Sequence, residues 1–374
     1  MKKICYVDED GRFGGPQQRM LTVANELKNR GYTIDFLIPK DEIDIFKQKL
    51  IKNNFNFYQV NLTRLSLKPL FLIRYIVLFF YEIYLLIIFF KKKKYDIIQA
   101  NSTPQFKAII VCIILKLNSV WVIEDSYFPK IIVFLFRLFA RISNCKIIYT
   151  SERVYNFYFK DKSILKNYKV EIFAPINTFK FDKNIEFSKP KYLLNNKIVI
   201  TTVSSIVPVK GVGYFLKAAE ILYNKNNDLE FIIAGSSISS QKKYYSKIKK
   251  IIEEKKYIKH IGMCDDVPQL LANSDIFVCT SISEAGPMTV YEAMLMQLPV
   301  VTTDVGACNQ IIKNYVNGII VPIKMPEKIA EAVEKLINDK KLRNTIGKNA
   351  HDFAKDFFSL EKIIRQYTDL YNKF

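Results

Sequence analysis

The chain has 374 residues, more than a single hydrophobic core usually supports, so two domains are expected. Hydrophobic residues make up 49% of the sequence, which excludes a largely disordered chain. The formal net charge is +20. This excess reflects either a composition rich in lysine throughout or attraction to an anionic partner such as a membrane surface, nucleotide phosphates or nucleic acid.

The six cysteines are scattered along the chain, and none of them forms a CxxC pair. Because only His260 and His351 could assist them, the sequence argues against a zinc site, and both histidines are expected to be structural. Isolated cysteines in apolar surroundings are typical of a reduced, cytoplasmic protein. The stretch 1–13 reaches acidic residues after one short apolar run, so it is interpreted as a first strand and not as a signal peptide.

The first forty residues predict a strand, a glycine-rich loop, a helix and a second strand. The strand is expected over 3–8 and the loop over 11–15, and Pro16 suits the first position of a helix that Gly31 ends. The next strand is expected over 32–39. Short apolar strands that alternate with helices predict a parallel, doubly wound sheet. Further strands are expected near 96–100, 120–123 and 146–150.

The same pattern restarts after a polar stretch, 180–196, which lacks periodicity and is interpreted as a linker. Two Rossmann-like units joined in this way predict a bilobed α/β protein with a cleft between the lobes. Ligands of such sheets bind beyond the carboxyl ends of the strands, so the loops there are expected to carry the chemistry. In the second unit we expect strands over 197–204, 229–234, 260–262, 275–280 and 299–303 and helices over 211–223 and 289–296.

The segment 65–90 is unusually apolar and is followed by four lysines, 91–94. It is long enough to cross a bilayer. However, Arg74 and Glu82 interrupt it, and each would cost on the order of a few kcal/mol at membrane depth. Because a strand resumes directly afterwards, we expect a buried or partly membrane-facing helix of the first domain instead of a spanning one.

A second segment, 130–146, spaces Lys130, Arg137, Arg141 and Lys146 through apolar residues. It is either a core helix with a solvated basic edge or an interfacial helix on anionic lipid. Beside the first apolar segment, it favours contact with a membrane.

The stretch 281–299, SISEAGPMTVYEAMLMQLP, follows an apolar strand and leads through a loop into a helix. Glu284 lies in the loop and Glu292 in the early turns of the helix, so both carboxylates can point into one pocket. Carboxylates accept hydrogen bonds from adjacent hydroxyls, as recognition of a sugar or a ribose requires. Spacing alone also fits a surface helix with two solvated glutamates.

The turn formed by Gly286, Pro287 and Met288 leads into the same helix. Its backbone N–H groups and the positive end of the helix dipole can receive a phosphate. This turn is therefore a candidate anion site beside the two glutamates.

The stretch resembles the signature of the family 4 retaining glycosyltransferases: Glu284 and Glu292 match the E-x7-E motif within the frame E-A-G-P…E-A-M. In the first domain, the loop with Gly14 and Gly15 resembles the family's glycine loop after the first strand. The resemblance covers most of the second domain specifically and the first only loosely. Further segments similar to that family lie at 209–211, 232–235, 271–277, 299–306 and 317–322.

The resemblance implies the GT-B architecture, in which two facing Rossmann-like α/β domains border an interdomain cleft. Residues 1–180 would form an N-terminal acceptor domain with basic and apolar membrane-proximal helices. Residues 197–355 would form the C-terminal domain that binds a nucleotide sugar. Residues 356–374 are expected to form a helix that packs back on the N-terminal domain.

The resemblance also implies a role for each motif residue. Glu292 would bind the ribose hydroxyls, and Glu284 would contact the donor sugar. The backbone of 285–288 would hold sugar hydroxyls and the diphosphate. Lys210, beside Gly211 at a helix start, would neutralise the diphosphate as it leaves.

Two departures from the family pattern matter. An arginine usually precedes that lysine, and here Ser205 stands in its place among the donor-binding candidates. Many members also have a histidine–aspartate pair in the first domain, where this chain has Glu124 and Asp125. Either one of these carboxylates serves the acceptor, or their loop is purely structural.

Two shorter features of the first domain complete the candidates. Gly14 and Gly15 either form a simple turn or allow close approach of the acceptor or of a donor phosphate, and their place after the first strand favours close approach. Ser151 follows a strand and precedes a helix, so it is expected first of all to cap that helix.

The function implied is metal-independent, retaining transfer of a hexose-type sugar from a uridine- or guanosine-linked nucleotide-diphosphate sugar. The acceptor would be a lipid-linked or cell-surface glycan in polysaccharide, capsule or lipopolysaccharide biosynthesis. No cofactor and no metal are expected, since the DxD pattern at 8–10 lies away from the donor motifs. The expected location is cytoplasmic, on the inner face of the cytoplasmic membrane, with its anionic surface as a partner.

Three alternatives remain at this point. Ser205 and the missing histidine fit a catalytically inactive nucleotide-sugar-binding protein. The net charge fits a basic nucleic-acid-binding protein, although the lysines are spread and no recognised nucleic-acid module occurs, so nucleic acid is not expected as a partner. The segment 71–90 fits an integral membrane protein.

Overall fold

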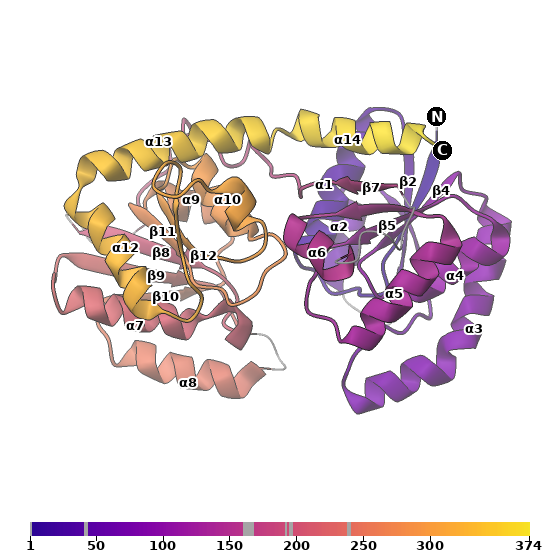
Figure 1. The fold of residues 1–374 in the computed structure, drawn as a ribbon, viewed down its shortest axis with the longest axis horizontal. Coiled ribbons are helices and arrows are strands. Elements are labelled where there is room, and N and C mark those ends of the chain that lie inside the picture. The colour runs from indigo at the N-terminus through magenta and orange to yellow at the C-terminus, as the bar shows by residue number, and fades with distance from the viewer. Residues whose placement is uncertain (1, 41–43, 160–167, 191–192, 194–196, 238–240) are drawn as a thin grey trace. The chain divides into compact units, whose positions relative to one another are not determined.

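The computed structural model describes residues 2–40, 44–159, 168–190, 193, 197–237 and 241–374 (Figure 1). The chain divides into two compact units, and each is described by itself. The first domain comprises Met1–Pro175 together with Glu361–Phe374, and the second comprises Ile176–Leu360. The boundaries expected at 180 and 356 fall inside the second domain, and residues 191–192 and 194–196 of the expected linker lie outside the described residues.

The first domain is built on a parallel sheet of seven strands in the order β3-β2-β1-β4-β5-β6-β7. The strand order reverses between the neighbours β1 and β4, which is the switch point of this sheet. The strands predicted near 96–100, 120–123 and 146–150 are confirmed, whereas β3 and β7 were not predicted. The strands are β1 (Lys3–Val7), β2 (Thr33–Pro39), β3 (Asn56–Val60), β4 (Ile97–Asn101), β5 (Ser119–Ile123), β6 (Lys146–Tyr149) and β7 (Lys169–Glu171).

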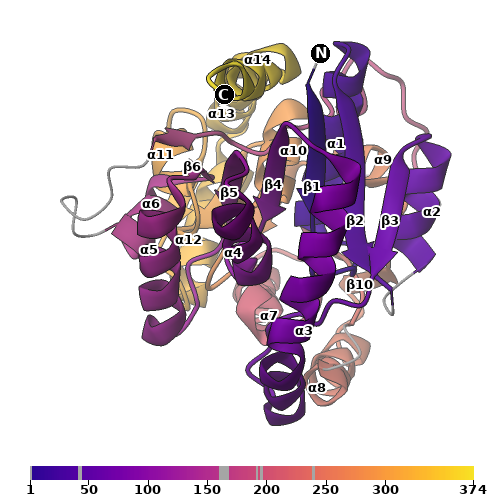
Figure 2. The ribbon, with the colours of Figure 1, turned by 90° about the vertical axis from the view of Figure 1, so that its right-hand side faces the viewer.

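Helices cover both faces of this sheet, as a doubly wound topology requires. Figure 2 shows α3, α4 and α5 next to one another over one face. The first-domain helices are α1 (Gly15–Asn29), α2 (Asp44–Lys52), α3 (Pro69–Lys93), α4 (Phe106–Leu115), α5 (Lys130–Ser143), α6 (Glu152–Phe159) and α14 (Leu360–Asn372).

The C-terminal helix α14 packs on the first domain through a buried hydroxyl network. The hydroxyls of Tyr371 and Tyr6 are 3.0 Å apart, and the Tyr371 hydroxyl also donates to Oε1 of Gln99 at 2.5 Å. All three side chains are buried. The last residues of the chain therefore complete the core of its first domain.

The second domain has a parallel sheet of six strands in the order β10-β9-β8-β11-β12-β13, with its switch point between β8 and β11. Its strands are almost continuously apolar because helices cover both faces. The strands are β8 (Ile198–Val203), β9 (Leu229–Ala234), β10 (Ile258–Gly262), β11 (Ile276–Cys279), β12 (Val300–Thr303) and β13 (Ile319–Val321). The helices are η1 (Pro208–Lys210), α7 (Val212–Tyr223), α8 (Lys242–Glu253), α9 (Val267–Ala272), α10 (Met288–Leu295), α11 (Cys308–Ile311), α12 (Pro326–Asn338) and α13 (Lys340–Phe357).

Three local predictions concern side chains that serve the fold. Ser151 caps α6, since its Oγ accepts the N–H of Val154 at 3.3 Å, as predicted. His260 Nε2 lies 2.7 Å from the carbonyl oxygen of Gly235, and His351 Nδ1 lies 2.6 Å from that of Leu295. Both histidines are thus bonded to backbone, in agreement with a structural role.

The apolar segment 65–90 contributes most of α3. Within the described residues, α3 is the one helix that is long and apolar enough to cross a membrane by length and composition. Only 22% of its most apolar window is buried inside the protein. α3 connects β3 to β4 and so belongs to the sheet domain, which agrees with the expectation of an in-domain helix.

The expectation of a basic edge on α5 needs a correction at one position. The Nε of Arg137 donates to the backbone oxygen of Tyr158 at 2.7 Å, so this guanidinium ties α5 to α6. Arg141, one turn later, is exposed. Of these two arginines, only Arg141 can contribute to a basic outer face.

Candidate active site

Lys210 lies in the loop that follows β8. The short helix η1 ends at Lys210 and is followed by Gly211, whose φ of 67° lies in the left-handed region that favours glycine. A Cβ at Gly211 would lie 2.0 Å from the backbone oxygen of Thr280, whose hydroxyl donates to the oxygen of Gly211 at 3.0 Å. Glycine at this position therefore lets the loops after β8 and β11 come into contact.

This contact brings Lys210 to Glu284. The ammonium of Lys210 forms an ion pair with the Glu284 carboxylate in the loop after β11. Ser281 Oγ donates to the same carboxylate oxygen at 2.8 Å. The side chain of Lys210 is 29% exposed and that of Glu284 is 14% exposed, so both can still be reached from solvent. The pair lies after the two strands that form the switch point, where parallel sheets bind their ligands.

The turn from Ala285 to Met288 is held by the loop that follows β12. Gly306 has a φ of 55°, and a Cβ there would lie 2.7 Å from the backbone oxygen of Ala285. Thr303 Oγ1 donates to the backbone oxygen of Ser281 at 2.6 Å. α10 begins at Met288, directly after Gly286 and Pro287, so the N–H groups that open this helix lie next to the turn.

Glu292 lies on α10, in its second turn, with a half-buried side chain. Burial raises the pKa of its carboxyl to about 7, and the positive charge of Lys180 opposes this rise. In the described part of the chain, no hydrogen bond or ion pair holds this carboxylate, and none joins it to Glu284. A half-buried carboxyl of raised pKa, beside a loop at the carboxyl end of a central strand, is a candidate for ligand recognition.

Ser205 stands in the same loop as Lys210, and its side chain is half-buried. The loop after β9 packs against it: Gly235 has a φ of 142°, and a Cβ there would lie 1.9 Å from the backbone oxygen of Ser204. Among the described residues, no hydrogen bond connects Ser205 to Lys210. Ser205 therefore shares a loop with Lys210, but no hydrogen bond in the described residues links it to the Lys210–Glu284 ion pair.

Gly14 and Gly15 form the start of α1 in the first domain. The φ of Gly14 is −159°, an extended conformation that any residue adopts. The backbone oxygen of Gly14 accepts the N–H of Gln18 at 2.9 Å, which is the first hydrogen bond of the helix. No atom lies within 4 Å of a Cβ built on Gly15. The fold itself does not need glycine at Gly15, and the open space is compatible with close approach of a ligand.

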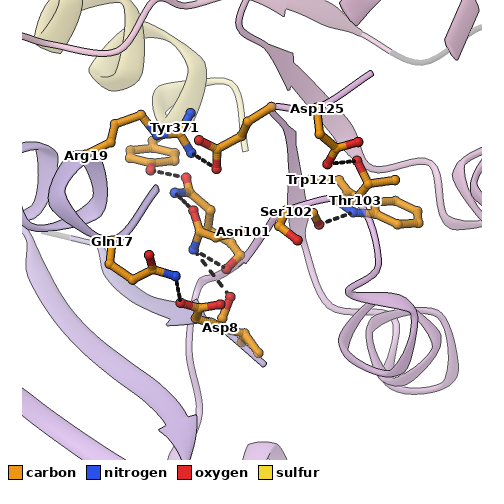
Figure 3. A network of polar contacts seen from close by, with 12 residues as sticks. Asp8, Gln17, Arg19, Asn101, Ser102, Thr103, Trp121, Asp125 and Tyr371 are labelled. Atoms are coloured by element: carbon orange, nitrogen blue, oxygen red, sulfur yellow. Dashed lines mark hydrogen bonds and ion pairs between the residues drawn. The ribbon is translucent and has the colours of Figure 1, made fainter. Parts of the chain in front are cut away.

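The loop before Gly14 is shaped by Asp8, at the carboxyl end of β1. One oxygen of its carboxylate accepts the N–H of Asp10 at 3.0 Å. The other accepts from the Gln17 amide at 2.8 Å (Figure 3). Burial raises the pKa of Asp8 well above its usual value. The 8–10 acidic triplet is therefore part of an internal turn.

Glu124 and Asp125 follow β5, and the structure separates their roles. Glu124 Oε1 accepts from Arg19 Nη2 at 2.9 Å, and the Arg19 side chain is 2% exposed. This ion pair fastens α1 to the end of β5. Glu124 is therefore engaged in the fold.

Asp125 instead accepts from two hydroxyls. One belongs to Tyr158, at 2.6 Å, and the other to Thr103, at 3.1 Å (Figure 3). Burial raises the pKa of its carboxyl to about 7, and the negative charge of Glu124 adds to the rise. Ser102, which precedes Thr103 after β4, has a φ of 86°, a conformation that non-glycine residues rarely adopt outside functional or tight turns. Asp125 thus lies among polar side chains in the loops that follow the adjacent strands β4 and β5.

Comparison with known proteins finds a sequence similarity within the second domain. Residues 184–353 match the model of the family described as glycosyl transferases group 1. The capsular polysaccharide biosynthesis glycosyltransferase CapM of Staphylococcus aureus is 30% identical over 207 residues, 52% of this chain and 51% of that protein. The UDP-Gal:alpha-D-GlcNAc-diphosphoundecaprenol alpha-1,3-galactosyltransferase of Escherichia coli is 28% identical over 182 residues, 48% and 46% of the two chains. The chain spans about half the length of these relatives.

Comparison with solved structures extends over the whole chain. HepE of Anabaena in complex with UDP matches with a TM-score of 0.85 at 19% identity, covering 100% of both chains. WaaG, a glycosyltransferase involved in lipopolysaccharide biosynthesis, matches with a TM-score of 0.71 at 16% identity, covering 98% of this chain and 99% of that one. At these identities the likeness shows the fold alone. The protein has the GT-B fold, with two Rossmann-like α/β domains.

Proposed function

We propose that the protein is a glycosyltransferase that moves a hexose-type sugar from a nucleotide-diphosphate sugar to a lipid-linked or cell-surface glycan. The observation that carries this proposal is the Lys210–Glu284 ion pair at the switch point of the second sheet. It lies inside the region that matches group 1 glycosyl transferases. Glu292, with its unpaired carboxyl, lies on the helix that follows.

Lys210 would stabilise the leaving diphosphate. Negative charge grows on the diphosphate as the bond to the sugar breaks, and a positive group fixed beside it lowers the barrier. Without donor, Glu284 neutralises this ammonium, so that a bound diphosphate would share Lys210 with Glu284. The N–H groups at the start of α10, after Gly286–Met288, would add a second source of positive potential.

Glu292 and Glu284 would each bind one part of the donor, the ribose and the transferred sugar. A carboxylate accepts hydrogen bonds from two adjacent hydroxyls, such as those of a ribose. Glu292 would take this role, and Glu284 would contact the transferred sugar. Ser205 would lie along the donor without supplying the charge that an arginine would.

A uridine-linked donor is favoured over a guanosine-linked one. HepE was solved with UDP and with UDP-glucose, and the Escherichia coli relative is named for UDP-Gal. Retention of the anomeric configuration and independence of metal complete the proposal, on the resemblance to the family 4 enzymes. The configuration of the product by NMR and activity in the presence of EDTA test these two points.

The acceptor side is assigned to the first domain. The Escherichia coli relative and a Campylobacter jejuni relative are named for diphospho-undecaprenol acceptors, and CapM for capsular polysaccharide. A polyprenol-linked glycan acceptor fits a cytoplasmic enzyme that works on the inner face of the cytoplasmic membrane. Asp125 is the proposed acceptor contact, because Glu124 is held by Arg19.

A thermal-shift screen against uridine, guanosine and adenosine diphosphate sugars tests the donor, since a ligand that binds the folded protein raises its melting temperature. We expect a uridine diphosphate sugar to give the largest shift. Transfer assays with that donor and a panel of polyprenol-linked sugars then test catalysis. Donor binding without transfer to any acceptor would favour an inactive nucleotide-sugar binder, and no shift with any donor would overturn the proposal.

A further inference from the structure

Helix α3 presents an apolar stripe to solvent along its whole length. The stripe has the spacing of one helix face, and Leu70 and Phe80 within it are 81% and 79% exposed. Soluble proteins rarely expose contiguous apolar patches of more than a few hundred Å², so this stripe calls for a partner. Its principal side chains are Leu70, Ile73, Val77, Phe80, Tyr84 and Ile88.

The opposite face of α3 carries its acidic residue into the domain. Glu82 accepts the N–H of Thr63 at 3.0 Å and pairs with Lys107 of α4 at 2.5 Å. Lys107 is fully buried and also lies 3.2 Å from Glu9 in the loop after β1. Pulling α3 away from the sheet would leave the charge of Lys107 buried without its partner on this helix, which is strongly unfavourable. The helix is therefore built to lie on a surface while it stays on its domain.

Helix α5, on the same face of the sheet, repeats the pattern on a smaller scale (Figure 2). Its outward residues Ile131, Phe134 and Ile142 are 56–61% exposed. Lys130 and Arg141 are exposed beside them, and the sequence 130–143 contains no acidic residue. The outer face of this helix is thus apolar and basic.

Lysines mark the C-terminal end of α3. Lys91, Lys92 and Lys94 are exposed, while Lys93 Nζ donates inward to the Tyr58 hydroxyl at 3.0 Å. Apolar residues between basic ends fit a surface that is apolar inside and anionic outside, which is the interface of an anionic bilayer. A second copy of this chain fits less well, because a two-fold contact would bring the same basic residues together.

We propose that α3 and α5 form a lipid-docking face that binds the surface of an anionic bilayer. The apolar stripes enter the interface, while Lys91, Lys92, Lys130 and Arg141 contact anionic headgroups. Tyr84 of the α3 stripe suits the headgroup level, where amphipathic rings accumulate. The proposed function supplies the biological setting, a lipid-linked acceptor, but the face itself rests on the exposure and charge of these two helices.

Vesicle sedimentation tests this face with the full chain. Vesicles of phosphatidylcholine alone are compared with vesicles that contain one third phosphatidylglycerol, at low and high salt. We expect binding to the anionic vesicles, weakened by salt because headgroup contacts are screened. Absence of binding to the anionic vesicles would overturn the proposal.

A matched pair of variants separates the effect of the apolar stripe on vesicle binding from the effect of a change in net charge. The double variant Val77→Glu/Phe80→Glu changes the stripe, and Ile45→Glu/Ile51→Glu makes the same change at exposed residues of α2. We expect the α3 variant to lose at least about tenfold in partition and the α2 variant to lose much less, since only the first removes apolar insertion. Equal losses would overturn the proposal, as would a salt-stable dimer that the α3 variant abolishes.

A measurement of donor binding by the same variants distinguishes failure of the docking face from failure of the proposed function. Each variant is also measured for its melting temperature and for its shift with a uridine diphosphate sugar. Both variants should fold and keep the shift, because neither helix contributes a donor residue. Loss of vesicle binding with the shift intact supports the docking face, and an intact shift with unchanged vesicle binding in the α3 variant contradicts it while leaving the donor site standing.

Discussion

The ammonium of Lys210 and the carboxylate of Glu284 form an ion pair between the two loops that follow the central strands β8 and β11. The contact depends on Gly211, whose missing side chain leaves room for the backbone of Thr280. The second domain therefore holds a positive and a negative side chain together where parallel sheets bind their ligands.

Replacing Lys210 with alanine should depress turnover more than donor affinity, because the charge on the leaving diphosphate develops during the reaction. Loss of one such stabilising group typically lowers kcat by about 10²- to 10³-fold. Steady-state kinetics with a saturating donor measure the effect. Lys225→Ala, which removes a more exposed ion pair with Glu334 in the same domain, is the control and should leave kcat unchanged. Turnover of Lys210→Ala equal to that of the wild type would refute this role.

Gly211→Ala should destabilise the second domain. The φ of 67° alone is unfavourable for alanine by about 1–3 kcal/mol, and the new Cβ would collide with the Thr280 oxygen at 2.0 Å. Gly213→Ala is the matched control, because its Cβ would meet only side-chain atoms at 3.7 Å and a helix favours alanine. Urea unfolding should show a lower midpoint for the first variant alone. The same midpoint in both variants would contradict the packing described.

Glu292→Gln should stabilise the protein in a manner that depends on pH. The folded carboxyl has a pKa of about 7 against an ordinary 4.5, so the folded state keeps a proton that the unfolded chain releases between these values. Its contribution to the free energy of unfolding therefore falls as pH rises from 4.5 to about 7, and glutamine removes that loss. The difference in melting temperature between the variant and the wild type should grow across this window and level off above it. A difference that does not change with pH would count against a raised pKa of the Glu292 carboxyl in the folded protein.

In the first domain, Glu124→Gln and Asp125→Asn should have different effects. Glu124→Gln leaves the buried Arg19 charge without its partner, which costs about 3–5 kcal/mol in comparable cases. Asp125→Asn should raise the KM for the acceptor while leaving donor affinity unchanged. Acceptor kinetics and calorimetric titration of the donor separate the two. An unchanged acceptor KM in Asp125→Asn would remove this residue from the acceptor site.

Much of the second domain could be predicted from the sequence, because its information is local. The strands are short apolar runs, and the glutamates Glu284 and Glu292 sit in a loop–helix frame that can be read along the chain. The contact of Gly211 with Thr280 joins residues 69 positions apart, and nothing in the local pattern indicates it. The sequence therefore indicates the candidate residues, but the fold is needed to show that Lys210 and Glu284 meet.

The first domain shows where sequence reasoning stops. Glu124 and Asp125 are adjacent, and their sequence gives no reason to separate a structural role from a binding one. The separation comes from Arg19, 105 residues away, which pairs with Glu124 alone. Similarly, the periodicity of α5 does not reveal that Arg137 turns inward to Tyr158 while Arg141 stays outside. In each case a long-range partner decides the role.

The proposed function requires the second domain to bind a nucleotide-diphosphate sugar through Glu292. Calorimetric titration of a uridine diphosphate sugar into the wild type and into Glu292→Ala tests it most directly, with Glu331→Ala as an exposed control. We expect saturable binding by the wild type and the same affinity in the Glu331 variant. The Glu292 variant should bind about tenfold more weakly or worse, because it lacks a charged hydrogen-bond acceptor. Equal affinity of Glu292→Ala and the wild type would contradict it.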